Sequence, residues 1–283
     1  MLKYPIVSLP LLFIFSLSAC SGMESKKAEV PEIRPGILQG YLPMDIPVDS
    51  KAFVLPAPAE DSPRQELDDV VSAKALTLRG SPRWTLAQHD AHLGFPAAAN
   101  AFSCTLGIPV SEQETPELYM LLRRTLADVG LATYSAKNFY QRKRPFMINE
   151  EPTCTPDEEK ELRHDGSYPS GHTSIGWGWA LILSELAPER ADALLARGRA
   201  FGESRIVCNV HWYSDVVAGR MVAAAAVAKL HTNKDFLTAM TVVGEEIGRV
   251  REKGLPLNDD CSAEAEALST WPWRNRSPSA PPE

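Results

Sequence analysis

Residues 168–186 read YPSGHTSIGWGWALILSEL, a short polar turn that leads directly into an apolar run of helical length. Two further apolar helical patterns follow, over residues 188–202 and 211–230. An alternation of polar and apolar residues with period two, which a half-buried strand requires, does not persist anywhere in the chain. Helices packed on helices are the architecture that remains, so we expect an all-α, single-domain helical bundle.

The helical domain is expected to span residues 61–255. Apolar residues at helical spacing predict further helices over 66–79, 82–93, 116–139 and 235–252. Residues 147–166, with two prolines and a run of acidic side chains, are expected to form a surface loop. The proline-rich residues 20–60 are interpreted as a tether and an extended arm on the domain. Residues 256–283 are expected to be a C-terminal tail, with disorder from residue 277 onward.

The charge balance limits the class of partner. The 283 residues carry a formal net charge of -7, and 44% of them are hydrophobic. A nucleic-acid partner usually requires a basic face that neutralises phosphates, so we expect none. A local basic pocket can still hold a small anion.

The N-terminus has the features of an export signal. Lys3 precedes a largely apolar run over residues 6–17, which is shorter than the roughly 20 residues of a transmembrane helix. The run ends in Leu17-Ser18-Ala19-Cys20, which resembles the lipobox of bacterial lipoproteins, with a secretory signal and an incidental cysteine as the alternative. Residues 1–19 are therefore expected to be a signal peptide and Cys20 a lipidated cysteine. Because Ser21 is not aspartate, the expected location is periplasmic, anchored to the bacterial outer membrane.

The remaining cysteines are Cys104, Cys154, Cys208 and Cys261, an even number that suits an oxidising compartment. Four cysteines allow three pairings. Of these we favour Cys104 with Cys154 and Cys208 with Cys261. No two cysteines stand close enough to form the short ligand hairpin of a zinc site, and we expect no metal.

Three segments far apart in the sequence share one chemical theme, the binding of a tetrahedral oxyanion. The first, residues 137–145, reads KNFYQRKRP and places Lys137 and Arg144 seven residues apart, two turns along one helical face. Basic residues near the C-terminal end of a helix usually only interact favourably with the helix dipole. This segment therefore indicates an anion site only in combination with the other two.

The second segment is the turn Pro169-Ser170-Gly171-His172 before the apolar helix. Free backbone N–H groups at a helix start favour an anion, and so does the helix dipole. Gly171 lets the backbone approach closely, Ser170 adds a hydroxyl and His172 adds a titratable imidazole. A Ser170 that only caps the helix is the competing interpretation.

The third segment, residues 204–215, reads SRIVCNVHWYSD. If a helix begins near His211, then His211 and Asp215 lie on one face, where the carboxylate can accept a hydrogen bond from one ring nitrogen. The other nitrogen keeps its lone pair as a nucleophile, oriented as in a catalytic triad. In isolation, such a pair is more often a surface ion pair. The three segments together favour the catalytic interpretation instead.

Taken together, the segments resemble the signature of the phosphatidic acid phosphatase type 2 and vanadium haloperoxidase superfamily: Lys-x6-Arg-Pro, Pro-Ser-Gly-His and Ser-Arg-x5-His-x3-Asp. Residues 53–62, 168–180 and 202–220 further resemble the bacterial class A non-specific acid phosphatases. Asn209 departs from the glycine expected in that family, which puts the pocket wall beside His211 in question. The resemblance implies a helical bundle of the acid phosphatase and haloperoxidase type.

The resemblance implies an acid phosphatase that hydrolyses a broad range of phosphomonoesters through a phosphohistidine, without metal or cofactor and with a phosphotransferase side activity. The implied phosphoryl-binding residues are Lys137, Arg144, Ser170, Gly171 and Arg205. His211 would attack phosphorus, Asp215 would orient it, and His172 would protonate the leaving alcohol, which predicts an acid to near-neutral optimum. Small phosphomonoesters such as nucleotides or sugar phosphates are the implied partners, and a homo-oligomer is the implied assembly.

Three other functions fit part of the pattern. Related haloperoxidases hold vanadate in the same constellation, so an oxidase is the nearest chemical alternative. A lipoprotein that only binds phosphate would need no nucleophile. A membrane lipid phosphatase would need several long apolar spans, whereas residues 217–230 are too short and Arg220 interrupts them.

Overall fold

The computed structural model describes residues 29–45, 47–257 and 260–270, so the expected signal peptide, Cys20 and residues 277–283 lie outside the described residues. Contacts divide the chain into residues 1–30 and residues 31–283, and the second unit holds every element named below. The strands are β1 (Glu32–Arg34) and β2 (Ile37–Leu38), and the 3-10 helices are η1 (Ser50–Ala52), η2 (Ala97–Phe102), η3 (Pro156–Glu158) and η4 (Pro188–Arg190). The α-helices are α1 (Pro63–Leu76), α2 (Pro82–Ala91), α3 (Ser103–Leu106), α4 (Pro116–Leu131), α5 (Tyr134–Tyr140), α6 (Phe146–Asn149), α7 (Glu159–Leu162), α8 (Gly171–Leu186), α9 (Ala191–Val207), α10 (Tyr213–Leu230), α11 (Lys234–Lys253) and α12 (Cys261–Ser269).

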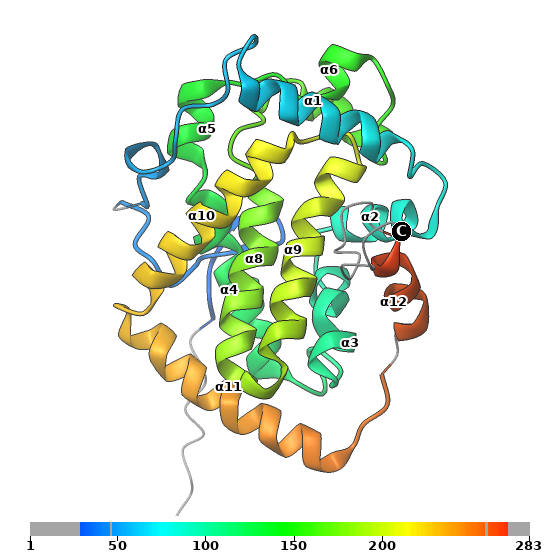
Figure 1. The fold of residues 1–283 in the computed structure, drawn as a ribbon. Helices are drawn as coiled ribbons and strands as arrows, with labels where there is room; N and C mark the ends of the chain where they lie inside the picture. Colours follow the sequence, from blue (N-terminus) through cyan, green and yellow to red (C-terminus); the bar gives the residue numbers. More distant parts are fainter. Residues whose placement is uncertain (1–28, 46, 258–259, 271–283) are drawn as a thin grey trace, which may run out of the picture. The chain divides into compact units, whose positions relative to one another are not determined.

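Helix α8 packs against α4, α9 and α10 (Figure 1). Trp179, Ile182 and Leu183 of α8 are fully buried, as expected of a helix that is apolar around most of its circumference. The Trp179 indole N–H donates to the Leu122 carbonyl oxygen of α4 (3.2 Å), which satisfies the polar atom of this buried ring. Within the described residues the only sheet is the antiparallel pair β1–β2, so the all-α expectation is confirmed.

Small residues bring α9 and α10 close to the start of α8. A Cβ atom on Gly219 of α10 would lie 2.6 Å from the Ser170 carbonyl oxygen. A Cβ atom on Gly202 of α9 would lie 2.6 Å from Thr173 Cγ2. Both distances are shorter than real Cβ contacts, so glycine at these two positions lets the third predicted segment approach the second.

Helices α1 and α2 begin where the sequence places serine before proline. The hydroxyl oxygens of Ser62 and Ser81 accept the backbone N–H groups of the residues three positions later. Pro63 and Pro82 then occupy the first helical position, where the missing N–H has no intrahelical acceptor to lose.

The helix expected over residues 116–139 is two helices, α4 and α5, so that prediction was wrong in its continuity. The Gly130 carbonyl oxygen accepts the Thr133 backbone N–H (3.3 Å) and the Thr133 hydroxyl (2.8 Å). These short-range bonds end α4 and redirect the chain before α5. The apolar spacing continues through the break, and no proline or C-terminal glycine marks it.

Other predicted bounds shift as well. The helix expected over 188–202 becomes η4 followed by α9, which runs on to Val207. The helix expected from His211 begins at Tyr213, so His211 precedes it. The expected loop 147–166 includes η3, α7 and the end of α6, and the expected tail 256–283 includes α12. None of the helices in the described ranges is long and apolar enough to cross a membrane.

The cysteine pairing favoured from the sequence was wrong. The disulfides are Cys104–Cys261, with Cα atoms 5.4 Å apart, and Cys154–Cys208, with Cα atoms 4.6 Å apart. The first joins α3 to α12, which packs on α2 (Figure 1). In the second, the Cys154 backbone N–H also donates to the Cys208 carbonyl oxygen (3.3 Å). The pairing therefore follows from how the loop before α7 lies along the end of α9, a tertiary contact that spacing does not reveal.

Candidate active site

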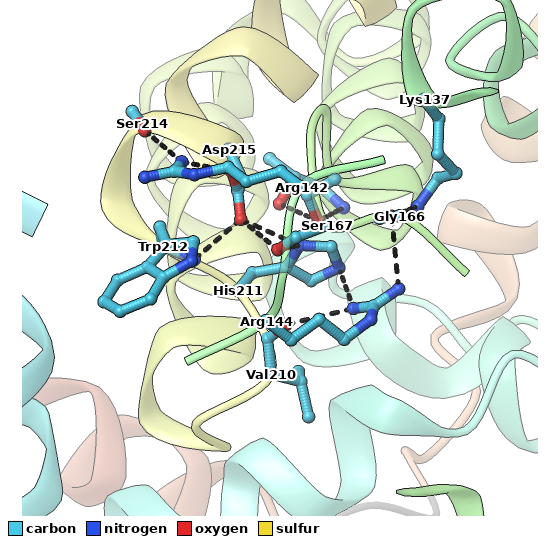
Figure 2. Close-up of polar contacts among 12 residues, drawn as sticks. Lys137, Arg142, Arg144, Gly166, Ser167, Val210, His211, Trp212, Ser214 and Asp215 are labelled. Carbon is cyan, nitrogen blue, oxygen red and sulfur yellow. Dashed lines mark hydrogen bonds and ion pairs between the residues drawn. The ribbon is translucent and has the colours of Figure 1, made fainter. Parts of the chain in front are cut away.

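The first predicted segment places two cations in the interior, but not on the single helix that was expected. Helix α5 ends at Tyr140, and Gln141 adopts a left-handed conformation with φ 44°. Lys137 and Arg144 therefore do not share a helical face, because the helix ends between them. Both are almost fully buried, at 3% and 1% exposure, and both point toward the loop that carries Gly166 (Figure 2).

These two cations meet at one carboxylate. The Lys137 ammonium donates to the Gly166 carbonyl oxygen (2.6 Å) and to Asp165 Oδ2 (3.1 Å). The Arg144 guanidinium donates to the same Asp165 oxygen (2.9 Å) and to the Val210 carbonyl oxygen (3.0 Å). Burial, reinforced by the neighbouring Arg144, lowers the pKa of Lys137 to about 8.

The second predicted segment begins α8. Ser170 is the N-cap residue, and its hydroxyl oxygen accepts the Thr173 backbone N–H (3.3 Å) and the Thr173 hydroxyl (2.9 Å). Ser170 is fully buried, and its own backbone N–H donates to the Asp215 carbonyl oxygen (3.1 Å). The capping interpretation thus describes Ser170 in this structure, while Gly171 and His172 face the cavity described below.

Arg205 of α9 is fully buried. None of its three side-chain nitrogens forms a hydrogen bond with a described residue. Burial lowers the pKa of Arg205 to about 10, and a guanidinium with that pKa is still charged near neutral pH. A buried cation whose five N–H donors have no acceptor among the described residues is suited to bind an anion, because such a group is costly to leave unpaired.

His211 lies between α9 and α10 and is buried. Its Nε2 atom lies 3.0 Å from an Arg144 guanidinium nitrogen. A guanidinium can only donate, so Nε2 must carry a lone pair, and the ring hydrogen of neutral His211 resides on Nδ1. Nδ1 lies 3.3 Å from Asp215 Oδ2, which accepts that hydrogen (Figure 2). The lone pair on Nε2 is the form that a histidine nucleophile requires.

The Asp215 carboxylate is fixed from several directions. Oδ2 accepts the backbone N–H of Trp212 (2.8 Å) and a short hydrogen bond from the Ser167 hydroxyl. Oδ1 accepts from the Arg142 guanidinium (2.7 Å), which also lies 2.7 Å from Asp68 of α1. The predicted pair of His211 and Asp215 is therefore present, but Asp215 is held by capping and by Arg142 rather than by a helical face shared with His211 (Figure 2).

A cavity of about 220 Å³ joins the three segments. The cavity is lined by Gly171 and by five predicted site residues that are charged or are histidines: Lys137, Arg144, His172, Arg205 and His211. Another part of its wall is apolar and comes from the β1–β2 hairpin and from α4, through Ile33, Ile37, Leu126 and Leu131. The cavity can thus hold a small anion beside an organic group.

The two histidines are electrostatically similar in this cavity. Burial holds the pKa of His211 well below its usual range, with repulsion from Arg144, Lys137 and Arg205 adding to the effect. Burial likewise lowers the pKa of His172, with Arg205 as the next cause. Both rings are therefore neutral near pH 7 in the absence of an anion.

Four polar residues at the site were not assigned by sequence reasoning. Arg142 lay inside the first quoted segment, but nothing in the sequence separates it from its basic neighbours. Asp165 and Ser167 lie immediately before the second segment. Asp68 lies in α1 beside Asp69, and no motif separates it from the neighbouring acids. No group of three or more His, Cys, Asp or Glu side chains within the described ranges is arranged to hold a metal ion.

The unexpected Asn209 has a left-handed backbone with φ 60°, a conformation that favours glycine. Asparagine is among the few other residues that adopt it readily. The buried Asn209 amide donates to the Glu151 carbonyl oxygen (2.8 Å) and to Asn149 Oδ1 (3.1 Å). Asn209 thus ties the preceding loop to the chain before His211, and it is not among the residues that line the cavity.

Comparison with known proteins places this site in a family. Residues 118–236 match the PAP2 superfamily. The non-specific acid phosphatase of Salmonella typhimurium is 42% identical over 201 residues, 71% of this chain and 80% of that protein. The non-specific acid phosphatase of Providencia stuartii is 41% identical over 213 residues (75% and 86%), and the acid phosphatase of Zymomonas mobilis is 41% identical over 207 residues (72% and 77%). The chain therefore belongs to the bacterial class A non-specific acid phosphatases of the PAP2 superfamily.

Proposed function

We propose that this acid phosphatase hydrolyses small phosphomonoesters without a metal, through a covalent phosphohistidine on His211. The observation that carries the proposal is the neutral His211 ring, whose Nε2 atom keeps a lone pair and accepts from Arg144, in a cavity that Arg205 also lines without a hydrogen-bond partner among the described residues. Three buried cations supply the charge that would otherwise be sought from a metal ion.

In the first step, the phosphoryl oxygens bind to Lys137, Arg144 and Arg205, and the Gly171 backbone N–H adds a donor at the start of α8. Nε2 of His211 attacks phosphorus, forming a P–N bond while the bond to the ester oxygen breaks. As the ring becomes cationic, Asp215 stabilises the hydrogen on Nδ1, as in a catalytic triad.

The leaving oxygen requires a proton, which we assign to His172. Its Nε2 atom lies 3.0 Å from the Ala91 carbonyl oxygen, which can only accept, so Nε2 carries a hydrogen and Nδ1 is the nitrogen that gains and gives the proton. Burial lowers the pKa of His172, and repulsion from Arg205 is the next cause. A bound phosphoryl group offsets that repulsion and so favours the protonated ring when it is needed.

In the second step, water attacks the phosphohistidine, His172 accepts a proton from it, and the P–N bond breaks to release phosphate and neutral His211. An alcohol in the place of water would yield a new ester, which accounts for the proposed phosphotransferase side activity. Because the first step needs a protonated His172, we propose an acid to near-neutral optimum.

The setting of the enzyme follows from the N-terminal sequence. We propose export by the signal in residues 1–19, lipidation of Cys20 and anchoring at the outer membrane on the periplasmic side. Two disulfides support an oxidising compartment. A homo-oligomer is proposed from the family resemblance.

Hydrolysis of p-nitrophenyl phosphate in excess EDTA tests the chemistry, with His211→Ala as the test variant and His89→Ala, an exposed histidine of α2, as the matched control. We expect activity that survives the chelator, persists in the control and is lost in His211→Ala. Acid-labile, alkali-stable phosphate trapped on the rapidly quenched wild-type protein would identify the phosphohistidine. Full activity in His211→Ala, or activity abolished by EDTA and restored by a divalent metal, would refute the proposed route.

A further inference from the structure

One carboxylate occupies the point where two phosphate-binding cations meet. Asp165 Oδ2 lies 3.1 Å from the Lys137 ammonium and 2.9 Å from an Arg144 guanidinium nitrogen. Asp165 lines the same cavity as His211 and Arg205. The chain's own anion therefore neutralises two of the cations on which the proposed function depends, whereas no described residue pairs with Arg205.

The loop around Asp165 is held by its backbone rather than by this carboxylate. The Asp165 carbonyl oxygen accepts from Arg144 Nε (3.0 Å), and the Gly166 carbonyl oxygen accepts from Lys137 (2.6 Å). The Asp165 side chain is 37% exposed, whereas the side chains of Lys137 and Arg144 are 4% and 2% exposed. The carboxylate can therefore rotate toward solvent while the loop backbone and both cations keep their positions.

We propose that Asp165 is a built-in competitor of the phosphoryl group, which weakens the binding of inorganic phosphate and so promotes release of the product. This inference rests on the proposed phosphatase function. A phosphoryl oxygen that reaches Lys137 and Arg144 takes the place of the carboxylate oxygen, and any carboxylate charge that stays nearby repels the phosphate.

The competition weakens the binding of every phosphoryl group that uses Lys137 and Arg144, whether substrate or product. An ester adds the contacts of its organic group with the apolar part of the cavity wall, through residues such as Ile37 and Leu131. Inorganic phosphate has no such group, so its affinity depends on the cations alone. With Asp165 in place, an ester therefore stays bound through its organic group, whereas inorganic phosphate, which lacks that group, is released more readily.

Calorimetric titration of the full chain with inorganic phosphate at about pH 6 tests this. We expect Asp165→Asn to lower the dissociation constant about fivefold to tenfold, the effect of removing one like charge a few ångströms away. Asp157→Asn, at an exposed acid of η3, makes the same change in net charge as a matched control. Asp165→Ala should tighten binding as well.

The inhibition constant of phosphate in ester hydrolysis should fall by the same ratio. If Asp165 instead only positioned the two cations, Asp165→Ala would weaken phosphate binding and lower kcat, and Asp165→Asn would partly restore both. Unchanged or weaker binding in Asp165→Asn, or equal tightening in Asp157→Asn, overturns the proposal. An absence of ester hydrolysis in the wild-type protein would overturn the proposed function instead, and the titration would still report on Asp165.

Discussion

Arg142 connects the stability of the fold to the orientation of His211, the proposed nucleophile. Its guanidinium, 9% exposed, lies 2.7 Å from Asp68 and 2.7 Å from Asp215, whose side chains are 1% and 0% exposed. Removal of one partner from a buried ion pair costs about 3–5 kcal/mol, because the remaining charge is left uncompensated. Arg142→Ala leaves two such carboxylates, so we expect a loss near the upper end of that range and a fall in Tm of about 10 °C or more.

The same substitution should reduce catalysis through Asp215. Arg142 is not among the residues that line the cavity, so KM should change little. Without Arg142, Asp215 is less firmly fixed and His211 loses part of its orientation. We expect kcat to fall on the order of a hundredfold, less than the roughly 10⁴-fold effect of disabling a triad carboxylate itself.

Urea unfolding and steady-state hydrolysis of p-nitrophenyl phosphate measure both effects. Arg79→Ala is the control, because its ion pair with Glu151 is 40% and 47% exposed and should contribute less than about 1 kcal/mol. Addition of Asp68→Asn to Arg142→Ala should recover part of the lost stability, since one stranded charge is removed. If Arg142→Ala unfolds within about 1 kcal/mol of the wild type and keeps its kcat, the assigned role of Arg142 is wrong.

Three further perturbations test other parts of the structure. Burial raises the pKa of Asp128 from 3.8 to about 6. This residue therefore contributes stability that is present below about pH 4 and lost as the pH rises through 6. Unfolding measured across that pH window should show a component of about 3 kcal/mol that Asp128→Asn lacks. Gly219→Ala should cost about 1–3 kcal/mol and lower kcat by displacing the Ser170 turn, whereas Gly248→Ala, where a Cβ meets nothing within 4 Å, should not destabilise in the same melting experiments. Replacement of Cys154 and Cys208 by serine opens a link across 54 residues and should cost about 4 kcal/mol in urea unfolding under oxidising conditions, and an unchanged midpoint would contradict a structural role for this disulfide.

The sequence predicted the helical class and the family because those depend on local patterns. The apolar run from His172 is one uninterrupted stretch of sequence, and so is each of the three motif segments. The cavity brings charged residues of the three segments together. Helix starts at Pro63 and Pro82 follow from the capping serines before them. In each case the residues that determine the local structure lie within a few positions of the feature predicted.

The predictions that were wrong depend on contacts between distant segments. The Cys154–Cys208 pairing follows from the path of a loop along α9, and no spacing rule contains that path. The end of α4 depends on which donors reach the Gly130 carbonyl oxygen. Arg142 gains its importance from Asp68, which is 74 residues away in sequence. Such partners become visible only when the helices are placed beside one another.

The unpaired guanidinium of Arg205 has a consequence for the protein before any substrate arrives. Folding buries this cation and provides no hydrogen-bond acceptor for it among the described residues, so its N–H donors are already in place when the chain is folded. At Arg205, an incoming tetrahedral anion therefore meets a charge that needs little reorganisation. The same anion acts as a folding ligand, since whatever binds only the native state shifts the unfolding equilibrium. The free energy of unfolding of this enzyme should accordingly depend on which anions the solution contains, and not only on its ionic strength.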